Sequence, residues 1–118
     1  MQTKSWSLYL VKNKLGSLYC GICTDLARRF TEHASDGNLC AKALRGKGPL
    51  SLAFAVHVSD RSVALKQEYW LKKQTRGYKL SVIAGNTTLP FDHQPYSSVE
   101  LAQIQQHAYA KKSAKTDH

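Results

Sequence analysis

The segment Leu18–His33 constrains the fold more than any other, because its apolar residues change period in the middle. The first part has the two-residue period of a strand, with apolar side chains at Leu18, Cys20 and Ile22. The second part has helical spacing, with apolar side chains at Leu26, Phe30 and Ala34. Thr24 lies at the switch as a candidate N-cap, and Asp25 follows it where the helix dipole favours an anion. The segment therefore predicts a strand, a tight turn and a helix over 25–34.

Three side chains of this segment are predicted to meet. Arg29 and His33 are four residues apart, so they share one edge of the predicted helix. Tyr19 lies on the strand that leads into that helix. A phenol, a guanidinium and an imidazole are therefore expected at one place.

A second strand precedes this segment. Trp6–Val11 alternates in the same way, and Asn13–Gly16 has the composition of a turn, so a hairpin is expected. Pairing centred near Lys14 would place Tyr9 opposite Tyr19 on the same face. A slip of one residue would place the two rings on opposite faces, and plain packing of two tyrosines is the alternative to a functional pair.

A third strand and a helix come later in the chain. Leu50–Ser59 alternates, with one face predicted from its larger apolar residues, Leu50, Leu52, Phe54, Val56 and Val58. Asp60 is a candidate cap for a helix over 61–76 that Gly77 would end. On a helical wheel Glu68 falls in the middle of the apolar face, which comprises Ala64, Leu65, Leu71 and Thr75. A carboxylate there requires a cation, a metal or a hydrogen-bond cluster, and a structural salt bridge is an equally good reading.

The remaining segments are simpler. A short helix is expected over 38–45 and another over 78–84, followed by a loop over 86–96. Ser97 and Glu100 fit a capping box, which predicts a helix over 97–112. The polar end, residues 113–118, is expected to be disordered.

The charge of the chain restricts its partners. The 118 residues include 17 Lys and Arg against 8 Asp and Glu, a net charge of +9. Such an excess favours nucleic acid first and an anionic membrane surface second, although a merely basic protein is a plainer reading. The candidate phosphate contacts are Arg28, Lys42, Arg45 and Lys47, with a solvated charge run as the alternative. Without an apolar run of membrane length or a signal-peptide pattern, we expect a cytoplasmic protein that does not enter a membrane.

The three cysteines do not indicate a metal site. Their odd number indicates reduced thiols. Cys20 and Cys23 are three apart on a strand, so they point to opposite faces, and a second Cys-x-x-Cys is missing from the sequence. The sequence therefore argues against a zinc site, even with His33 and Cys40 as further candidates.

The candidate residues together suit phosphodiester hydrolysis. That reaction needs a base for water, a cation for the phosphorane charge and a carboxylate for a divalent metal. Arg29 suits a phosphate oxygen, because its guanidinium is bidentate and always charged. Glu68 alone is enough for a magnesium ion that keeps several waters. Tyr19 is a poor base at the usual phenol pKa of about 10, and a neighbouring cation would favour its phenolate.

The chain resembles a GIY-YIG nuclease domain of the small, stand-alone bacterial kind. The two signature elements correspond to Leu8-Tyr9-Leu10 and Tyr19-Cys20-Gly21. Further matches are found at Thr24-Asp25-Leu26 with Arg29 and His33, at 41–48, and at 64–69, which resembles the metal-carboxylate helix. The likeness covers about Trp6 to Gly85, which defines a predicted nuclease-like domain over 1–85.

The resemblance implies an α/β (α+β) sandwich with a central three-stranded antiparallel sheet flanked by helices. It also implies an endonuclease (a hydrolase) that cleaves DNA with Mg²⁺ or Mn²⁺ by a single-metal mechanism. Tyr19 would be the general base or position the attacking water, and Tyr9 would hydrogen-bond within the site. Arg29 would bind the scissile phosphate, Glu68 would hold the metal, and His33 would contact the phosphate or assist proton transfer.

Two positions depart from patterns found in some members of the family. Ile22 stands where some have a lysine, and Lys79 follows Gly77-Tyr78 where others have an asparagine. The size of the chain favours recognition of branched, flapped or single-stranded DNA in repair or processing, with RNA left open. The alternatives are a non-catalytic nucleic-acid-binding module and a protein–protein adaptor, and the sequence implies neither a protein partner nor an oligomeric state.

Overall fold

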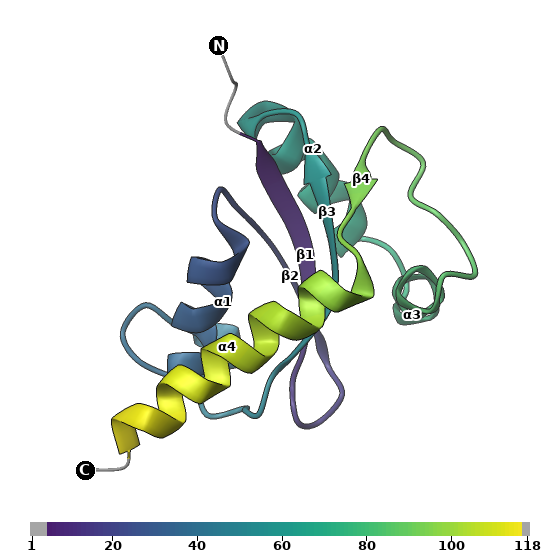
Figure 1. Ribbon diagram of the computed structural model, residues 1–118. Helices are drawn as coiled ribbons and strands as arrows, with labels where there is room; N and C mark the ends of the chain where they lie inside the picture. The colour runs from purple at the N-terminus through teal and green to yellow at the C-terminus, as the bar shows by residue number, and fades with distance from the viewer. Residues whose placement is uncertain (1–4, 117–118) are drawn as a thin grey trace.

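A computed structural model describes residues 5–116 of the chain, with side chains over residues 5–110. The strands are β1 (Trp6–Lys12), β2 (Leu18–Cys23), β3 (Ser51–Val58) and β4 (Gln94–Pro95). The helices are α1 (Leu26–Ser35), α2 (Arg61–Lys72), α3 (Arg76–Ala84) and α4 (Ser98–Thr116), with a 3₁₀ turn, η1, at Lys42–Leu44. The predicted α+β class is confirmed (Figure 1).

The described sheet has four antiparallel strands in the order β2-β1-β3-β4, so the prediction of three strands was wrong. The fourth strand is two residues long, with Val56 opposite Pro95 and His57 opposite Gln94. It lies in the segment 86–96 that was predicted to be a loop. Two residues are too few to show alternation, and a proline is tolerated in a strand at the edge of a sheet.

The hairpin forms, but its register differs from the predicted one. Tyr9 lies opposite Gly21, and Val11 lies opposite Tyr19. The pairing is therefore centred on Leu15, one residue further along than expected, which offsets the tyrosines by two positions. An offset of two keeps both rings on the same face, because successive strand residues alternate between faces.

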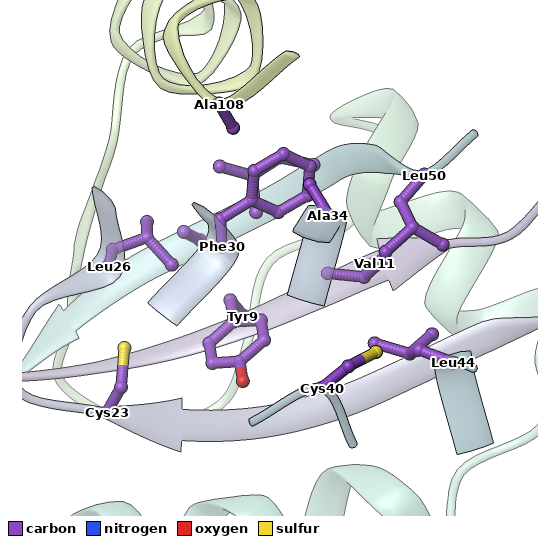
Figure 2. Packing of buried hydrophobic residues seen from close by; sticks show 12 residues of the cluster. Tyr9, Val11, Cys23, Leu26, Phe30, Ala34, Cys40, Leu44, Leu50 and Ala108 are labelled. Carbon is purple, nitrogen blue, oxygen red and sulfur yellow. The ribbon is translucent and has the colours of Figure 1, made fainter. Parts of the chain in front are cut away.

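The sheet is covered on both faces (Figure 1). Helices α1 and α4 pack on each other and α4 packs on β3, whereas α2 packs on β1 and β2 from the other side. Figure 2 shows the first core, where Phe30 of α1 lies beneath Ala108 of α4, on the side of the sheet that carries Tyr9. The second core lies under α2 and α3 and comprises Leu8, Leu10, Cys20, Val56, Val58, Ala64, Leu71, Val82 and Leu89.

The prediction that the larger apolar residues of β3 share one face was wrong, because the strand contains a β-bulge. The pairing shifts between Leu10 and Val11, which lie opposite Phe54 and Leu52. The extra residue in β3 turns Leu52 into the first core, while Val56 and Val58 belong to the second. A sequence alternation cannot show such a bulge, since the residues on either side of it are all apolar.

Several helix ends differ from the prediction. Asp25, not Thr24, is the N-cap of α1, and its Oδ1 accepts a hydrogen bond from the Arg28 N–H at 3.1 Å. The helix predicted over 61–76 ends at Lys72, because Thr75 starts α3 as a new cap. The short helix expected over 38–45 is only the turn η1.

The capping box was predicted correctly. The Ser97 N–H donates to Glu100 Oε1 at 2.9 Å, and the Glu100 N–H donates to Ser97 Oγ at 3.1 Å. Helix α4 continues to Thr116, beyond the predicted end at residue 112. The division of the chain at residues 85, 96 and 112 stays a prediction, and residues 117–118 of the predicted disordered tail lie outside the described residues. Among the described helices, none has the length and apolar character needed to cross a membrane.

Candidate active site

The centre of the candidate site is a hydrogen bond between β1 and α1. The Tyr9 hydroxyl lies 2.8 Å from His33 Nε2, and each residue is only 1 % exposed. The Ala41 N–H donates to His33 Nδ1 at 3.4 Å. A neutral imidazole that accepts at Nδ1 carries its proton on Nε2, so His33 is the donor to the Tyr9 oxygen.

The electrostatic surroundings keep both groups neutral. Burial, followed by the charge of Arg29, lowers the pKa of His33 to about 4. Burial is also the main reason why the pKa of Tyr9 is raised far above its usual value. Arg29 opposes that rise as a charge and as a hydrogen-bond donor to the Tyr9 hydroxyl. At neutral pH the pair is therefore an uncharged imidazole and an uncharged phenol.

Gly21 makes room for this hydrogen bond. A Cβ atom at position 21 would lie 2.5 Å from the Tyr9 hydroxyl oxygen and 3.1 Å from Tyr19 Cε2. These distances leave no space for a methyl group between the two rings. The register of the hairpin, which sets Gly21 opposite Tyr9, thus explains the glycine of the second signature element.

Tyr19 is the more accessible of the two tyrosines. Its ring centroid lies 5.5 Å from that of His33 and 6.4 Å from that of Tyr9. Burial raises the pKa of Tyr19, while the charges of Arg29 and Lys72 oppose the rise. The two cations favour the phenolate, as the sequence argument expected of a neighbouring cation, but desolvation outweighs them and the pKa is raised overall.

Arg29 is held from two sides. Its Nη1 donates to Glu32 Oε1 at 2.8 Å and to the Leu39 carbonyl at 2.7 Å. Its charge acts on Tyr9, Tyr19 and His33. A guanidinium has five N–H donors, so these two bonds and the one to the Tyr9 hydroxyl still leave donors for an anion.

Glu68 reaches the same group of residues from the opposite layer. Its charge raises the pKa of Tyr19 and of Cys20, both on β2. Its carboxylate forms an ion pair with Lys72 Nζ at 3.4 Å, and its side chain is 18 % exposed. Glu68 therefore lies at the margin of the buried face of α2. The prediction that it lies at the centre of the apolar face was wrong.

The rotation of α2 about its own axis explains why Glu68 lies at the margin of the buried face. The residues of α2 that are buried are Ala64, Gln67 and Leu71, and Leu65 is 40 % exposed. A helical wheel gives only relative angles, and packing against β1 and β2 selects the face that is covered.

In the described residues, groups of three or more His, Cys, Asp or Glu placed to share a metal do not occur. One carboxylate still fits a hard divalent ion that keeps most of its waters.

The predicted nucleic-acid contacts have different surroundings. Arg28 is exposed and pairs with Glu32 at 2.9 Å. Arg45 is held by the chain itself, through the carbonyls of Cys40 at 3.3 Å and Asn38 at 3.1 Å. Lys42 is exposed, and Lys47 is half-buried. Whether any of them binds nucleic acid stays a prediction.

The two unusual positions lie on the α2 side of the sheet. Ile22 packs against the second core. Lys79 Nζ donates to the Lys72 carbonyl at 3.4 Å, and its charge opposes the rise in the pKa of Cys20 that burial causes. All three cysteines are buried, and Cys20 and Cys23 lie in different cores, as their spacing predicted.

Sequence reasoning missed two groups of the site. Lys72 pairs with Glu68 and acts on Tyr19, and its position four residues after a glutamate was a readable signal. The Ala41 N–H, which sets the tautomer of His33, is a backbone group. A backbone contact leaves no trace in residue types, so the sequence held no signal for it.

Comparison with known proteins identifies the family of this chain. Residues 5–80 match the family model described as the GIY-YIG catalytic domain. The chain is 51 % identical over 86 residues to UPF0213 protein Ent638_3592 of Enterobacter sp. (strain 638), covering 73 % of this chain and 82 % of the relative. It is also 51 % identical over 74 residues to UPF0213 protein YhbQ of Salmonella typhimurium, covering 63 % of this chain and 72 % of the relative.

A solved structure also matches part of this chain. The solution structure of UPF0213 protein BH0048 from Bacillus halodurans is 32 % identical, with a TM-score of 0.44, and the match covers 68 % of this chain and 83 % of that one. The family model, which spans more than half of the sequence, includes every residue of the candidate site, from Tyr9 to Glu68. The chain therefore belongs to the GIY-YIG family.

Proposed function

We propose that this protein is an endonuclease that hydrolyses DNA phosphodiester bonds with a divalent metal ion, Mg²⁺ or Mn²⁺. The observation that carries the proposal is the convergence of Tyr9, Tyr19, Arg29 and His33 on one face of the hairpin. Glu68 acts electrostatically on Tyr19 of the same group from α2. Membership of the GIY-YIG family supports the same reaction class.

Each residue has a role that its surroundings suit. Glu68 would hold the metal, which when bound supplies positive charge to the phosphate and to the leaving oxygen. Arg29 binds a non-bridging phosphate oxygen with its remaining donors. Tyr19 orients the attacking water by accepting a hydrogen bond from it, a role that suits a phenol with a raised pKa. Buried Tyr9 and His33 fix the position of that ring and do not meet solvent themselves.

The substrate form that we propose is DNA with unpaired or branched regions, in repair or another processing step. A basic surface recognises the sugar-phosphate backbone of any strand, and such contacts do not require a long sequence to be read. The net charge of +9 supports a polyanionic partner.

The test is cleavage of end-labelled single-stranded, duplex and branched DNA in Mg²⁺ or Mn²⁺. Glu68→Ala and Tyr19→Phe should each abolish nicking, and so should a chelator. Lys66→Ala, at an exposed position of the same helix, is the matched control and should cut like the wild type. Equal cutting by Glu68→Ala would contradict the assignment.

A second candidate is a module that binds nucleic acid without cutting it. The observation in its favour is the ion pair between Glu68 and Lys72, which occupies the carboxylate that a metal would need. Wild-type protein that binds all three DNAs and cuts none of them would decide for this candidate. Salt-dependent binding would separate both candidates from a protein–protein adaptor.

A further inference from the structure

An exposed apolar edge of α2 lies next to the candidate metal carboxylate. Tyr69 directly follows Glu68 and is 64 % exposed, and Leu65, four residues earlier, is 40 % exposed. Side chains four apart on a helix are neighbours, so the ring and the isobutyl group lie side by side along one edge. An exposed aromatic ring in this place is not explained by packing of the core. The second core includes Ala64 and Leu71 on another face of α2, and the first core contains no residue of this helix.

Two lysines at the C-terminal end of the same helix, Lys72 and Lys73, lie beside this apolar edge. Lys73 Nζ lies 4.2 Å from the centroid of the Tyr69 ring, a cation–π contact that orients the ring and covers one of its faces. The exposure of Tyr69 leaves the rest of the ring open to solvent. Lys72 lies between this edge and Glu68 on the helix, paired with the carboxylate, and its side chain is 53 % exposed.

We infer that Leu65 and Tyr69 form a stacking platform for an unpaired base of the bound strand. An aromatic face beside positive charge is the combination that holds single-stranded nucleic acid, because the ring takes the base and the cations take the adjacent phosphates. Bases inside a duplex are already stacked and cannot lie on the ring. The inference rests on the proposed function and names its substrate class, namely a strand with unpaired nucleotides next to the scissile phosphate.

The experiment measures binding without cleavage. Fluorescence anisotropy in the presence of a chelator would compare three labelled probes at one salt concentration. The probes are a short single-stranded DNA, a strand of the same length made of abasic units, and a blunt duplex. The proteins are the wild type, Tyr69→Ala, Tyr69→Phe and the control Val99→Ala, which removes an apolar side chain that is 62 % exposed on α4.

Tyr69→Ala should weaken binding of the single-stranded DNA by roughly 5- to 150-fold, the range expected for loss of one base–aromatic stack. Binding of the abasic strand and of the duplex should change little, because neither offers a free base. Tyr69→Phe keeps the ring and should bind like the wild type, as should Val99→Ala.

The platform would be ruled out if Tyr69→Ala bound the single-stranded DNA as tightly as the wild type does. An equal loss on the abasic strand would also rule it out, since the ring would then act on the backbone and not on bases. If Tyr69→Ala loses affinity only for the strand that carries bases, and the wild type cuts no DNA, the platform is supported and only the proposed nuclease activity is contradicted.

Discussion

The Tyr9 hydroxyl and His33 Nε2 lie 2.8 Å apart in the interior, joining the first strand to the first helix across 24 residues of sequence. The Ala41 N–H fixes the other ring nitrogen, so the imidazole has one tautomer and one orientation. This hydrogen bond determines where the hairpin tyrosines lie relative to α1.

Stability should depend on pH through His33. The pKa of this residue is lowered from 6.5 to about 4, with burial as the main cause and the Arg29 charge as the second. The unfolded chain takes up the proton near pH 6.5, whereas the folded chain takes it up only near pH 4. The stabilisation is therefore complete above about pH 6.5 and is lost as the pH falls toward 4.

Urea unfolding at pH 7 and pH 5 measures this effect. The free energy of unfolding of the wild type should fall by about 2 kcal/mol more than that of His33→Gln, since glutamine does not titrate. His107→Gln, at an exposed position, is the control and should follow the wild type. Equal losses in the wild type and His33→Gln would show that His33 is not the group that titrates.

Gly21→Ala should disturb the site without adding any charge or polarity. The new methyl group would lie 2.5 Å from the Tyr9 hydroxyl oxygen, and Tyr9 is packed on all sides. Overpacking of this kind costs about 1–3 kcal/mol of unfolding free energy. Cleavage should fall sharply, because the ring of Tyr9 must move away from His33.

Gly37→Ala is a suitable comparison. Position 37 is exposed, and the nearest atom to a new Cβ there is Ser35 Oγ at 3.5 Å, an ordinary contact. This variant should unfold within about 1 kcal/mol of the wild type and retain its activity. Wild-type stability in Gly21→Ala would mean that the two rings are further apart than the structure places them.

Lys72→Ala should change metal binding more than stability. The ion pair with Glu68 is 3.4 Å long and the lysine is 53 % exposed, so its loss costs about 0–1 kcal/mol. Removal of the competing ammonium frees the carboxylate, and we expect half-saturation at a lower Mg²⁺ or Mn²⁺ concentration.

Titration calorimetry with each metal gives this concentration directly, with Lys66→Ala as the matched control on the same helix. Tighter binding in Lys72→Ala and unchanged binding in Lys66→Ala are the expected results. Weaker binding in Lys72→Ala would instead indicate that the lysine supports the metal site.

The thiols should be unreactive in the folded protein. Burial raises the pKa of Cys20 to about 12 and that of Cys23 to about 11, so almost no thiolate exists at pH 8. A thiol reagent should modify these cysteines on the order of 10²–10³-fold more slowly than in urea, where all three cysteines of the chain are accessible. Rapid modification of Cys20 in the native protein would show that the second core opens readily, and rapid modification of Cys23 would show the same for the first core.

Much of the site could be predicted because its members are local or follow a pattern. The strand-to-helix switch of 18–33 set Tyr19, Arg29 and His33 on adjoining elements, and these elements are present. The N-cap at Asp60 and the capping box at Ser97 are likewise short-range features, and both occur as predicted. Such signals depend on backbone groups within a few residues of each other, so no tertiary contact is needed to read them.

The wrong predictions about strand pairing and about the buried face of α2 depend on contacts between distant segments. The pairing of Tyr9 with Gly21, the bulge in β3 and the two-residue strand β4 arise from the way strands dock on each other. The exposed margin occupied by Glu68 depends on which face α2 turns toward the sheet.

The sequence by itself determined the types of the longer helices and strands, the candidate residues of the site and the basic charge, because periodicity, capping and composition are properties of short stretches. Only the tertiary structure decided that Tyr9 is buried and hydrogen-bonded to His33, and that Lys72 forms an ion pair with Glu68. It also decided that desolvation outweighs the nearby cations in setting the pKa of Tyr19. These outcomes are set by burial and by distances between segments far apart in the chain, and a one-dimensional pattern contains neither quantity.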